Sequence, residues 1–339
     1  MRIGLVLGAG GSVGLAYHGG VLDAIHSVTG YDPRRADVIV GTSAGSLTAA
    51  MLRAGLPAGD LAAISEDREL SPEGAALRRG SAIHSPRTSL GAFLRTRPLA
   101  DPRAVAEGLL RPWSRRPAAL AAALLPAGGI STGPISAGLN AHFGDGWPDR
   151  PTWITAVRLR DGRRIVFGRE GAPRAQLGSA VAASCAIPGY FSPVRIGGDR
   201  YVDGGVRSML NLPVLADLDL DLVIVSAPMA AASPWPTATA DAPLRLALRA
   251  QLVAEVLRVR RRGTQVLALA PGHQVALAMG VNAMDARRRH VVSRLACRST
   301  TRYLEHHAYG ARMADLLAGA AADPSGRVAD GAPAAAATA

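Results

Sequence analysis

Two units of strand, glycine turn and helix, both within the first 55 residues, constrain the fold of this chain most. The apolar run at residues 3–7 is followed by the glycine-rich segment GAGGSVG (8–14) and then by a helical pattern. A second apolar run at residues 37–40 leads through GTSAG (41–45) into an apolar helical face over residues 44–53. Repeated units of this kind place parallel strands side by side, with helices on the faces of the sheet. The sequence therefore predicts an α/β fold with a mostly parallel central sheet.

The rest of the chain supplies further strands and helices. Asp161-Gly162 separates two apolar runs and predicts a β-hairpin over residues 152–168, and Gly197-Gly198 predicts a second short pair. Additional buried strands and long helices are expected in order at residues 175–186 (helix), 220–228 (strand), 244–262 (helix), 264–271 (strand) and over most of 285–317 (helices).

We expect a single domain over residues 1–318, because a chain of 339 residues can bury one sizeable core. Residues 56–129 are rich in Ala, Leu, Arg and Pro and carry no strand pattern. This segment is expected to lie over the sheet as a helical lid or substrate-gripping region. The Ala-rich tail at residues 319–339 is interrupted by Pro and Gly and is expected to be disordered.

The charge of the chain excludes several functions. All 38 cationic side chains are arginine, because the chain has no lysine. This excludes a Walker-type phosphate loop and Schiff-base chemistry on a lysine amine. The net charge of +12 is compatible with nucleic acid, but the arginine clusters at 258–262 and 287–289 lack interleaved aromatic side chains for base stacking. We therefore expect no nucleic-acid partner, while contact with an anionic membrane surface and an ordinary solvated basic exterior both stay open.

Several features favour a cytoplasmic protein. The apolar part of MRIGLVLGAGG is too brief for a signal peptide, and no apolar run approaches the ~20 residues of a membrane-spanning helix. The chain has two cysteines, Cys185 and Cys297, which agrees with a reducing compartment, and we expect both to be small core residues. The sequence does not indicate an oligomeric state.

Ser43 is the candidate nucleophile. It stands between Gly41 and Gly45 in a G-x-S-x-G pattern, after an apolar strand and before a helix. Flanking glycines allow the sharp turn that exposes a serine hydroxyl, and the helix dipole favours negative charge developing there. The alternative is a tight turn in which this serine only caps the helix.

A serine hydroxyl needs a base, and Asp203 is the best candidate. The segment YVDGGV places Asp203 at the end of an apolar stretch, and Gly204 and Gly205 allow its carboxylate to approach another loop closely. None of the eight histidines follows a strand in a catalytic pattern, and His18 lies inside the first helix, where packing is the simpler role. An Asp-Gly surface turn is the alternative for Asp203.

The segment GAGGSVG is a candidate anion site. Its spacing fails the dinucleotide fingerprint, because Val13 occupies the position of the last glycine. Backbone amides at a helix N-terminus bind any anion, so the amides of Gly10, Gly11 and Ser12 could hold the oxyanion of an acyl-transfer reaction. Gly14 completes the glycine turn.

These three pieces, in this order, resemble the patatin-like phospholipases. The stretch ASCAIPGYFSPVRIGGDRYVDGG is similar to the family's approach to its catalytic aspartate, and DGGVRSMLNLPV is similar to the family's segment immediately after that aspartate. The resemblance implies a three-layer α/β/α sandwich and hydrolysis of lipid or other acyl esters by a Ser-Asp dyad. It implies Ser43 as nucleophile and Asp203 as base, with neither metal nor other cofactor.

One departure from the family pattern concerns the glycine loop. The family usually carries Arg or Lys just before the last glycine, where this chain has Val13, and its first glycine is Ala9 here. This departure keeps open a second hypothesis, a lipid- or protein-binding member with weak or no activity. Nucleotide binding through the glycine loop is a third.

Overall fold

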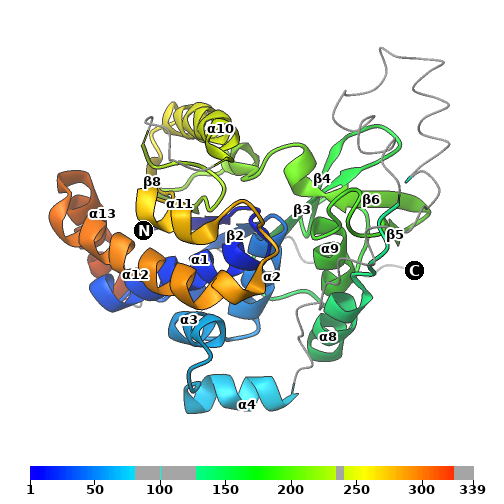
Figure 1. Cartoon of the computed structure of the whole chain (residues 1–339), viewed down its shortest axis with the longest axis horizontal. Coiled ribbons are helices and arrows are strands. Elements are labelled where there is room, and N and C mark those ends of the chain that lie inside the picture. Colours follow the sequence, from blue (N-terminus) through cyan, green and yellow to red (C-terminus); the bar gives the residue numbers. More distant parts are fainter. Residues whose placement is uncertain (81–99, 101–126, 234–239, 324–339) are drawn as a thin grey trace, which may run out of the picture.

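The computed structural model describes residues 1–80, 100, 127–233 and 240–323, and Figure 1 shows their arrangement. The central sheet has eight strands in the order β5-β6-β3-β2-β1-β7-β8, and β4 pairs with β3. From β3 to β8 along this order all neighbours are parallel, whereas β4, β5 and β6 pair antiparallel. The predicted mostly parallel α/β sheet is confirmed.

The strands are β1 (Ile3–Leu7), β2 (Val38–Gly41), β3 (Thr152–Arg158), β4 (Arg164–Phe167), β5 (Val194–Ile196), β6 (Asp199–Asp203), β7 (Leu222–Ser226) and β8 (Gln265–Leu269). The helices in the described residues are α1 (Gly11–Thr29), α2 (Ala44–Arg53), α3 (Ala58–Glu66), α4 (Pro72–Gly80), α8 (Gly133–Phe143), α9 (Leu177–Ser184), α10 (Ala242–Arg260), α11 (His273–Met279), α12 (Arg289–His306) and α13 (Ala308–Ala322). Of these helices, none combines the length and apolar character needed to cross a bilayer.

The first strand shows why the sheet has helices on both faces. Ile3, Leu5 and Leu7 belong to a core shared with α1, α3, α12 and α13, whereas Val6 belongs to a second core shared with α10. Successive side chains of a strand point to opposite faces, so an uninterrupted apolar run requires cover on both. Figure 1 shows α10 on one side of the sheet and α1, α12 and α3 on the other. The structure is therefore the expected three-layer sandwich.

Most expected elements form close to their predicted bounds. The start of the tail differs from the prediction, and the 56–129 segment is described only in part. The predicted tail begins at residue 319, but α13 continues to Ala322 because Leu317 and neighbouring apolar side chains still pack on the core. Within the predicted 56–129 segment, the described residues include α3, which packs against α1 and α12, and α4, which lies beyond α3 in Figure 1. The remainder of that segment at 81–99 and 101–126, like the tail at 324–339, lies outside the described residues.

Helix α1 lies at the centre of the helical layer because two adjacent glycines let its neighbours approach closely. A Cβ at Gly20 would lie 2.1 Å from the Ser293 carbonyl oxygen of α12, and one at Gly19 would lie 2.9 Å from the Leu61 carbonyl of α3. Backbone atoms cannot yield as side chains do, so any side chain here would push the helices apart. The position of α1, whose first residues form the glycine loop, thus depends on Gly19 and Gly20.

We predict that Gly20→Ala lowers the free energy of unfolding by about 2–3 kcal/mol, because α12 must move away from α1. Gly14→Ala in the same helix is the control, since a Cβ there meets only ordinary contacts at 3.5 Å or more. Alanine is the better helix former, so Gly14→Ala is expected to be neutral or stabilising by up to about 1 kcal/mol. Urea denaturation measures both, and equal midpoints for the two variants would contradict the close-packing argument.

Candidate active site

Ser43 occupies the turn between β2 and α2 in a strained backbone conformation. Its φ of 53° and ψ of −121° lie in a region that residues with a side chain rarely adopt. Strain of this kind costs roughly 1–3 kcal/mol and persists only where the surroundings enforce it. The buried Ser43 is therefore held in place rather than relaxed, as expected for a nucleophile elbow.

The glycines on either side of Ser43 are required by close backbone contacts. A Cβ at Gly45 would lie 2.0 Å from the Leu7 carbonyl oxygen at the end of β1, and one at Gly41 would lie 2.5 Å from the Ser46 Cα. The Gly45 amide donates to the Gly8 carbonyl at 3.2 Å. The elbow is thus locked against the strand end that begins the glycine loop.

Asp203 meets Ser43, although 160 residues separate them along the chain. Asp203 ends β6, which pairs with β3, and β3 in turn pairs with β2, the strand that leads to Ser43. The Ser43 side chain lies close enough to the Asp203 carboxylate to lower its pKa, and the Gly205 amide donates to Asp203 Oδ1 at 2.7 Å. The structure therefore brings the candidate nucleophile and the candidate base together.

Burial sets the protonation of Asp203. Desolvation raises the pKa of its carboxyl to about 6, against the opposing effects of the Ser43 side chain and the Gly205 amide. A carboxylate in that range is a stronger base than an ordinary aspartate and is still ionised at neutral pH. A Cβ at Gly204 would lie 2.6 Å from the Thr155 carbonyl oxygen, so this glycine is needed for Asp203 to sit so deep.

A polar network behind the dyad fixes the backbone of both residues. Ser184 Oγ accepts a hydrogen bond from the Ser43 amide at 2.9 Å and donates to the Thr155 carbonyl at 2.7 Å. Asn211 Nδ2 donates to the hydroxyls of Thr42 and Thr155, each at 3.1 Å. These buried contacts join α9, β3 and the segment after β6 to the elbow. Sequence reasoning missed Ser184 and Thr155, because no local pattern distinguishes them from ordinary core positions.

The glycine loop contains the amides that the sequence analysis offers as a candidate anion site. Gly11 has a φ of 59°, and a Cβ at Gly10 would lie 2.7 Å from the Gly14 Cα. Among the described residues, no acceptor is found for the amides of Gly10, Gly11 and Ser12, which stand at the N-terminus of α1. Donors left free at a helix N-terminus are suited to binding an oxyanion. Gly14, in contrast, has room for a side chain.

His18 anchors the glycine loop and is not placed as a base. Its Nε2–H donates to the Gly8 carbonyl at 2.8 Å, and its Nδ1 accepts from the Ser226 hydroxyl at the end of β7, also at 2.8 Å. Complete burial lowers the pKa of His18 to about 4, so the ring is neutral at physiological pH. This residue joins the ends of β1 and β7, where sequence reasoning expected only packing.

The position of Val13 explains how the loop accommodates its departure from the family pattern. The Val13 side chain is buried in the core, and its amide donates to the Ala283 carbonyl at 3.1 Å. Cys185 is also buried beside the elbow, where its thiol contacts the Ser43 carbonyl at 3.4 Å and burial raises its pKa to about 12. Neither side chain supplies a charge to the site.

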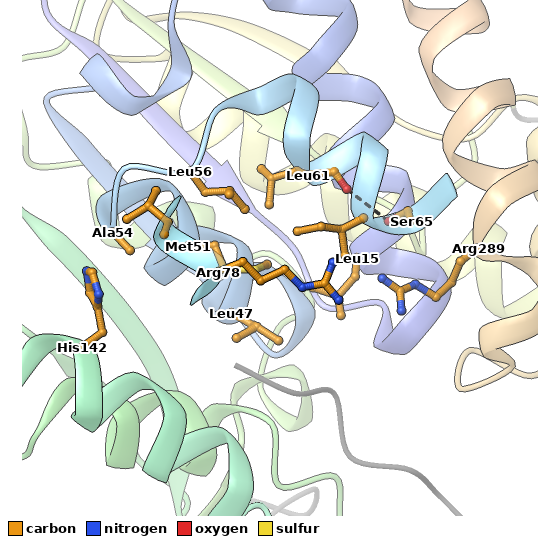
Figure 2. A pocket seen from close by; sticks show the side chains of 12 residues that line it. Leu15, Leu47, Met51, Ala54, Leu56, Leu61, Ser65, Arg78, His142 and Arg289 are labelled. Atoms are coloured by element: carbon orange, nitrogen blue, oxygen red, sulfur yellow. Dashed lines mark hydrogen bonds between the residues drawn. The ribbon is translucent and has the colours of Figure 1, made fainter. Parts of the chain in front are cut away.

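An apolar pocket lies beside α2, the helix that follows Ser43 (Figure 2). Its cavity volume is about 90 Å³, and Leu47, Met51 and Ala54 line it from α2. Leu15 from α1 and Leu61 from α3 complete its apolar wall. The mostly apolar lining of this pocket suits an apolar chain rather than a polar small molecule.

Within the described residues, no group of three or more His, Cys, Asp or Glu side chains is arranged to hold a metal ion.

Comparison with known proteins identifies the family of this chain. A family model described as patatin-like phospholipase matches residues 5–216. No curated protein gives a significant match. Among solved structures, VipD from Legionella pneumophila is 13% identical, with 90% of this chain and 67% of that chain covered at a TM-score of 0.43. The type III effector ExoU is 19% identical, with 93% and 54% covered at a TM-score of 0.35, so this chain spans about half of ExoU. Since the family model covers well over half of the 339 residues and includes both Ser43 and Asp203, the chain belongs to the patatin-like phospholipase family.

Proposed function

We propose that this protein is a serine hydrolase of lipid acyl esters that uses Ser43 as nucleophile and Asp203 as its base. The observation that carries the proposal is the Ser43 side chain on a strained elbow, next to the buried Asp203 carboxylate whose pKa it lowers. Family membership and the apolar pocket beside the elbow favour an acyl ester as the substrate.

The reaction begins with transfer of the Ser43 proton to Asp203 as Oγ attacks the ester carbonyl carbon. The carbonyl electron pair moves onto oxygen, and the amides of Gly10, Gly11 and Ser12 stabilise the resulting oxyanion. One such donor is typically worth about 3 kcal/mol in the transition state. The intermediate collapses, the alcohol leaves with the proton held by Asp203, and an acyl-serine remains.

Water then completes the cycle. It attacks the acyl-serine and gives a proton to Asp203, and a second oxyanion forms at the same amides. Collapse breaks the bond to Oγ, the proton returns to Ser43, and the carboxylic acid is released. A single carboxylate serves both steps as base and acid, which requires a pKa close to the working pH.

The alternative is a member of the family that binds lipid or protein without turnover. Val13 favours it, because the loop carries no cation beside the developing charge. A fluorophosphonate probe separates the two, since only an activated serine forms the stable adduct. Labelling mapped to Ser43 supports the hydrolase, and an unlabelled, folded protein supports the binding function.

We predict that Ser43→Ala and Asp203→Asn each lower kcat for p-nitrophenyl esters of short and medium chain acids by about 10³-fold or more, because each removes one half of the dyad. Ser299→Ala on α12 and Asp217→Asn at an exposed ion pair are matched controls and should keep parental activity. Both dyad variants hydrolysing at the parental rate, with unchanged circular dichroism, would refute the mechanism.

We predict that kcat/KM rises about tenfold per pH unit up to about pH 6 and is level above it, because only ionised Asp203 can accept the proton and burial raises its pKa to about 6. Initial rates of fatty-acid release from pH 4.5 to 8 measure the profile. An inflection near pH 4, the ordinary range of a carboxyl group, would contradict a desolvated base.

The same shift predicts a change in stability. The pKa of Asp203 is raised in the folded protein from 3.8 to about 6. The favourable contribution of its protonated carboxyl group to the free energy of unfolding is therefore complete below pH 3.8 and is lost as the pH rises through about 6. Asp203→Asn removes the ionised group, so at pH 8 the variant should be more stable than the parent by up to about 3 kcal/mol. Urea denaturation at pH 8 tests this, and a less stable variant would contradict burial of an ionised carboxylate.

A further inference from the structure

The apolar pocket begins one helical turn beyond the candidate catalytic groups. Leu47 follows Ser43 by four residues on α2, and Leu15 follows Gly11 by four residues on α1; both line the pocket. Four residues of helix rise about 6 Å, so this end of the pocket lies within a few bonds of the nucleophile. Met51 lies a further turn along α2, away from Ser43. An acyl chain in the pocket therefore places its ester end at the Leu15–Leu47 side.

Two arginines line the pocket at that same side. Arg78 comes from α4 and Arg289 is the first residue of α12, and Figure 2 shows their guanidinium groups facing one another beside Leu15. Burial and the neighbouring Arg78 lower the pKa of Arg289, while Asp67 has the opposite effect. The exposed Arg78 and the half-buried Arg289 repel each other, and Asp67 offsets this repulsion at Arg289; an anion bound between the two guanidinium groups would be attracted by both.

Arg289 has further features of an incomplete anion site. Its Nε is buried and has no hydrogen-bond partner among the described residues. A cation at the first residue of a helix also stands at the positive end of the helix dipole, where an anion is preferred. The segment before α12 packs on the glycine loop, since a Cβ at Gly11 would lie 2.7 Å from the Ala283 carbonyl oxygen. Arg289 is thus anchored near the catalytic end.

We propose that Arg78 and Arg289 bind a phosphate group of the acyl donor while its acyl chain occupies the apolar pocket. This inference rests on the proposed function and assigns its specificity. Guanidinium groups match phosphate oxygens with paired donors, and a phosphate supplies the acceptor that Arg289 Nε lacks. The closeness of the arginines to the ester end selects donors whose phosphate lies only a few bonds from the ester, as in an acylglycerol phosphate.

The test compares two substrates that differ only in the phosphate, a 1-acylglycerol 3-phosphate and the 1-monoacylglycerol of the same chain, by release of fatty acid. Arg289→Gln and Arg78→Gln should raise KM for the phosphate-bearing substrate tenfold or more and leave the kinetic constants for the monoacylglycerol within twofold. Arg287→Gln is the matched control, because that side chain is 91% exposed and pairs with Asp285. Equal losses on both substrates, or no loss on either, would overturn the proposal.

A binding measurement keeps this proposal separate from the hydrolase mechanism. Calorimetry on the Ser43→Ala protein compares dodecyl phosphate, the uncharged dodecyl glyceryl ether and inorganic phosphate. We expect dodecyl phosphate to bind at least tenfold more tightly than either, and Arg289→Gln to abolish the preference. Equal binding of the ether, or of inorganic phosphate, would overturn the site. If the Ser43→Ala protein binds dodecyl phosphate preferentially but the parent protein hydrolyses no ester, the hydrolase mechanism is refuted and the phosphate site is still supported.

Discussion

The close contact between the elbow and the end of β1 is the constraint on which the rest of the site depends. The Leu7 carbonyl accepts from the Thr42 amide at 3.0 Å, and the Gly8 carbonyl accepts from both Gly45 and His18. Two consecutive carbonyls therefore join the strand, the elbow and the first helix. Because the same two residues lead into the glycine loop, the position of Ser43 and that of the candidate oxyanion amides are set by one piece of backbone.

Charge is distributed unevenly around this backbone frame. Among the described residues, the side chains of Val13, Cys185 and His18 near Ser43 and the glycine loop are buried and uncharged. Such a low-polarity environment keeps the carboxylate basic, which a nearby cation would oppose. The arginines line a pocket whose wall includes neither Ser43 nor Asp203, so the proposal assigns recognition of an anionic group and activation of the nucleophile to separate places.

Much of this architecture was predictable from the sequence, because the relevant signals are local. Each strand is a short apolar run, and the elbow and the loop around Asp203 are marked by glycines that close contacts do require, Gly41, Gly45 and Gly204. Gly14 is an exception, since space there would admit a side chain. The resemblance to a known family joined Ser43 to Asp203 across 160 residues, which no local pattern could do.

The supporting contacts could not be predicted, because they join residues that only the fold brings together. Ser184 reaches the Ser43 amide across 141 residues, and His18 reaches Ser226 across 208. A serine near the end of a small-residue helix, or a histidine within an apolar one, has the same sequence signature whether or not it supports a site. Helix α8 also had no clear local signal, since its buried positions are few and glycines and prolines surround it.

The backbone conformation of Ser43 has a consequence for the history of such chains. A residue held at positive φ and a carboxylate kept out of water are both unfavourable for folding, and the proposed catalysis gives a reason to keep them. Once selection for turnover ends, mutations at these two positions increase stability and spread readily. In descendants that have become pure binding proteins, the elbow serine and its acid should therefore be among the first residues to drift, while the glycines that hold the helices together persist.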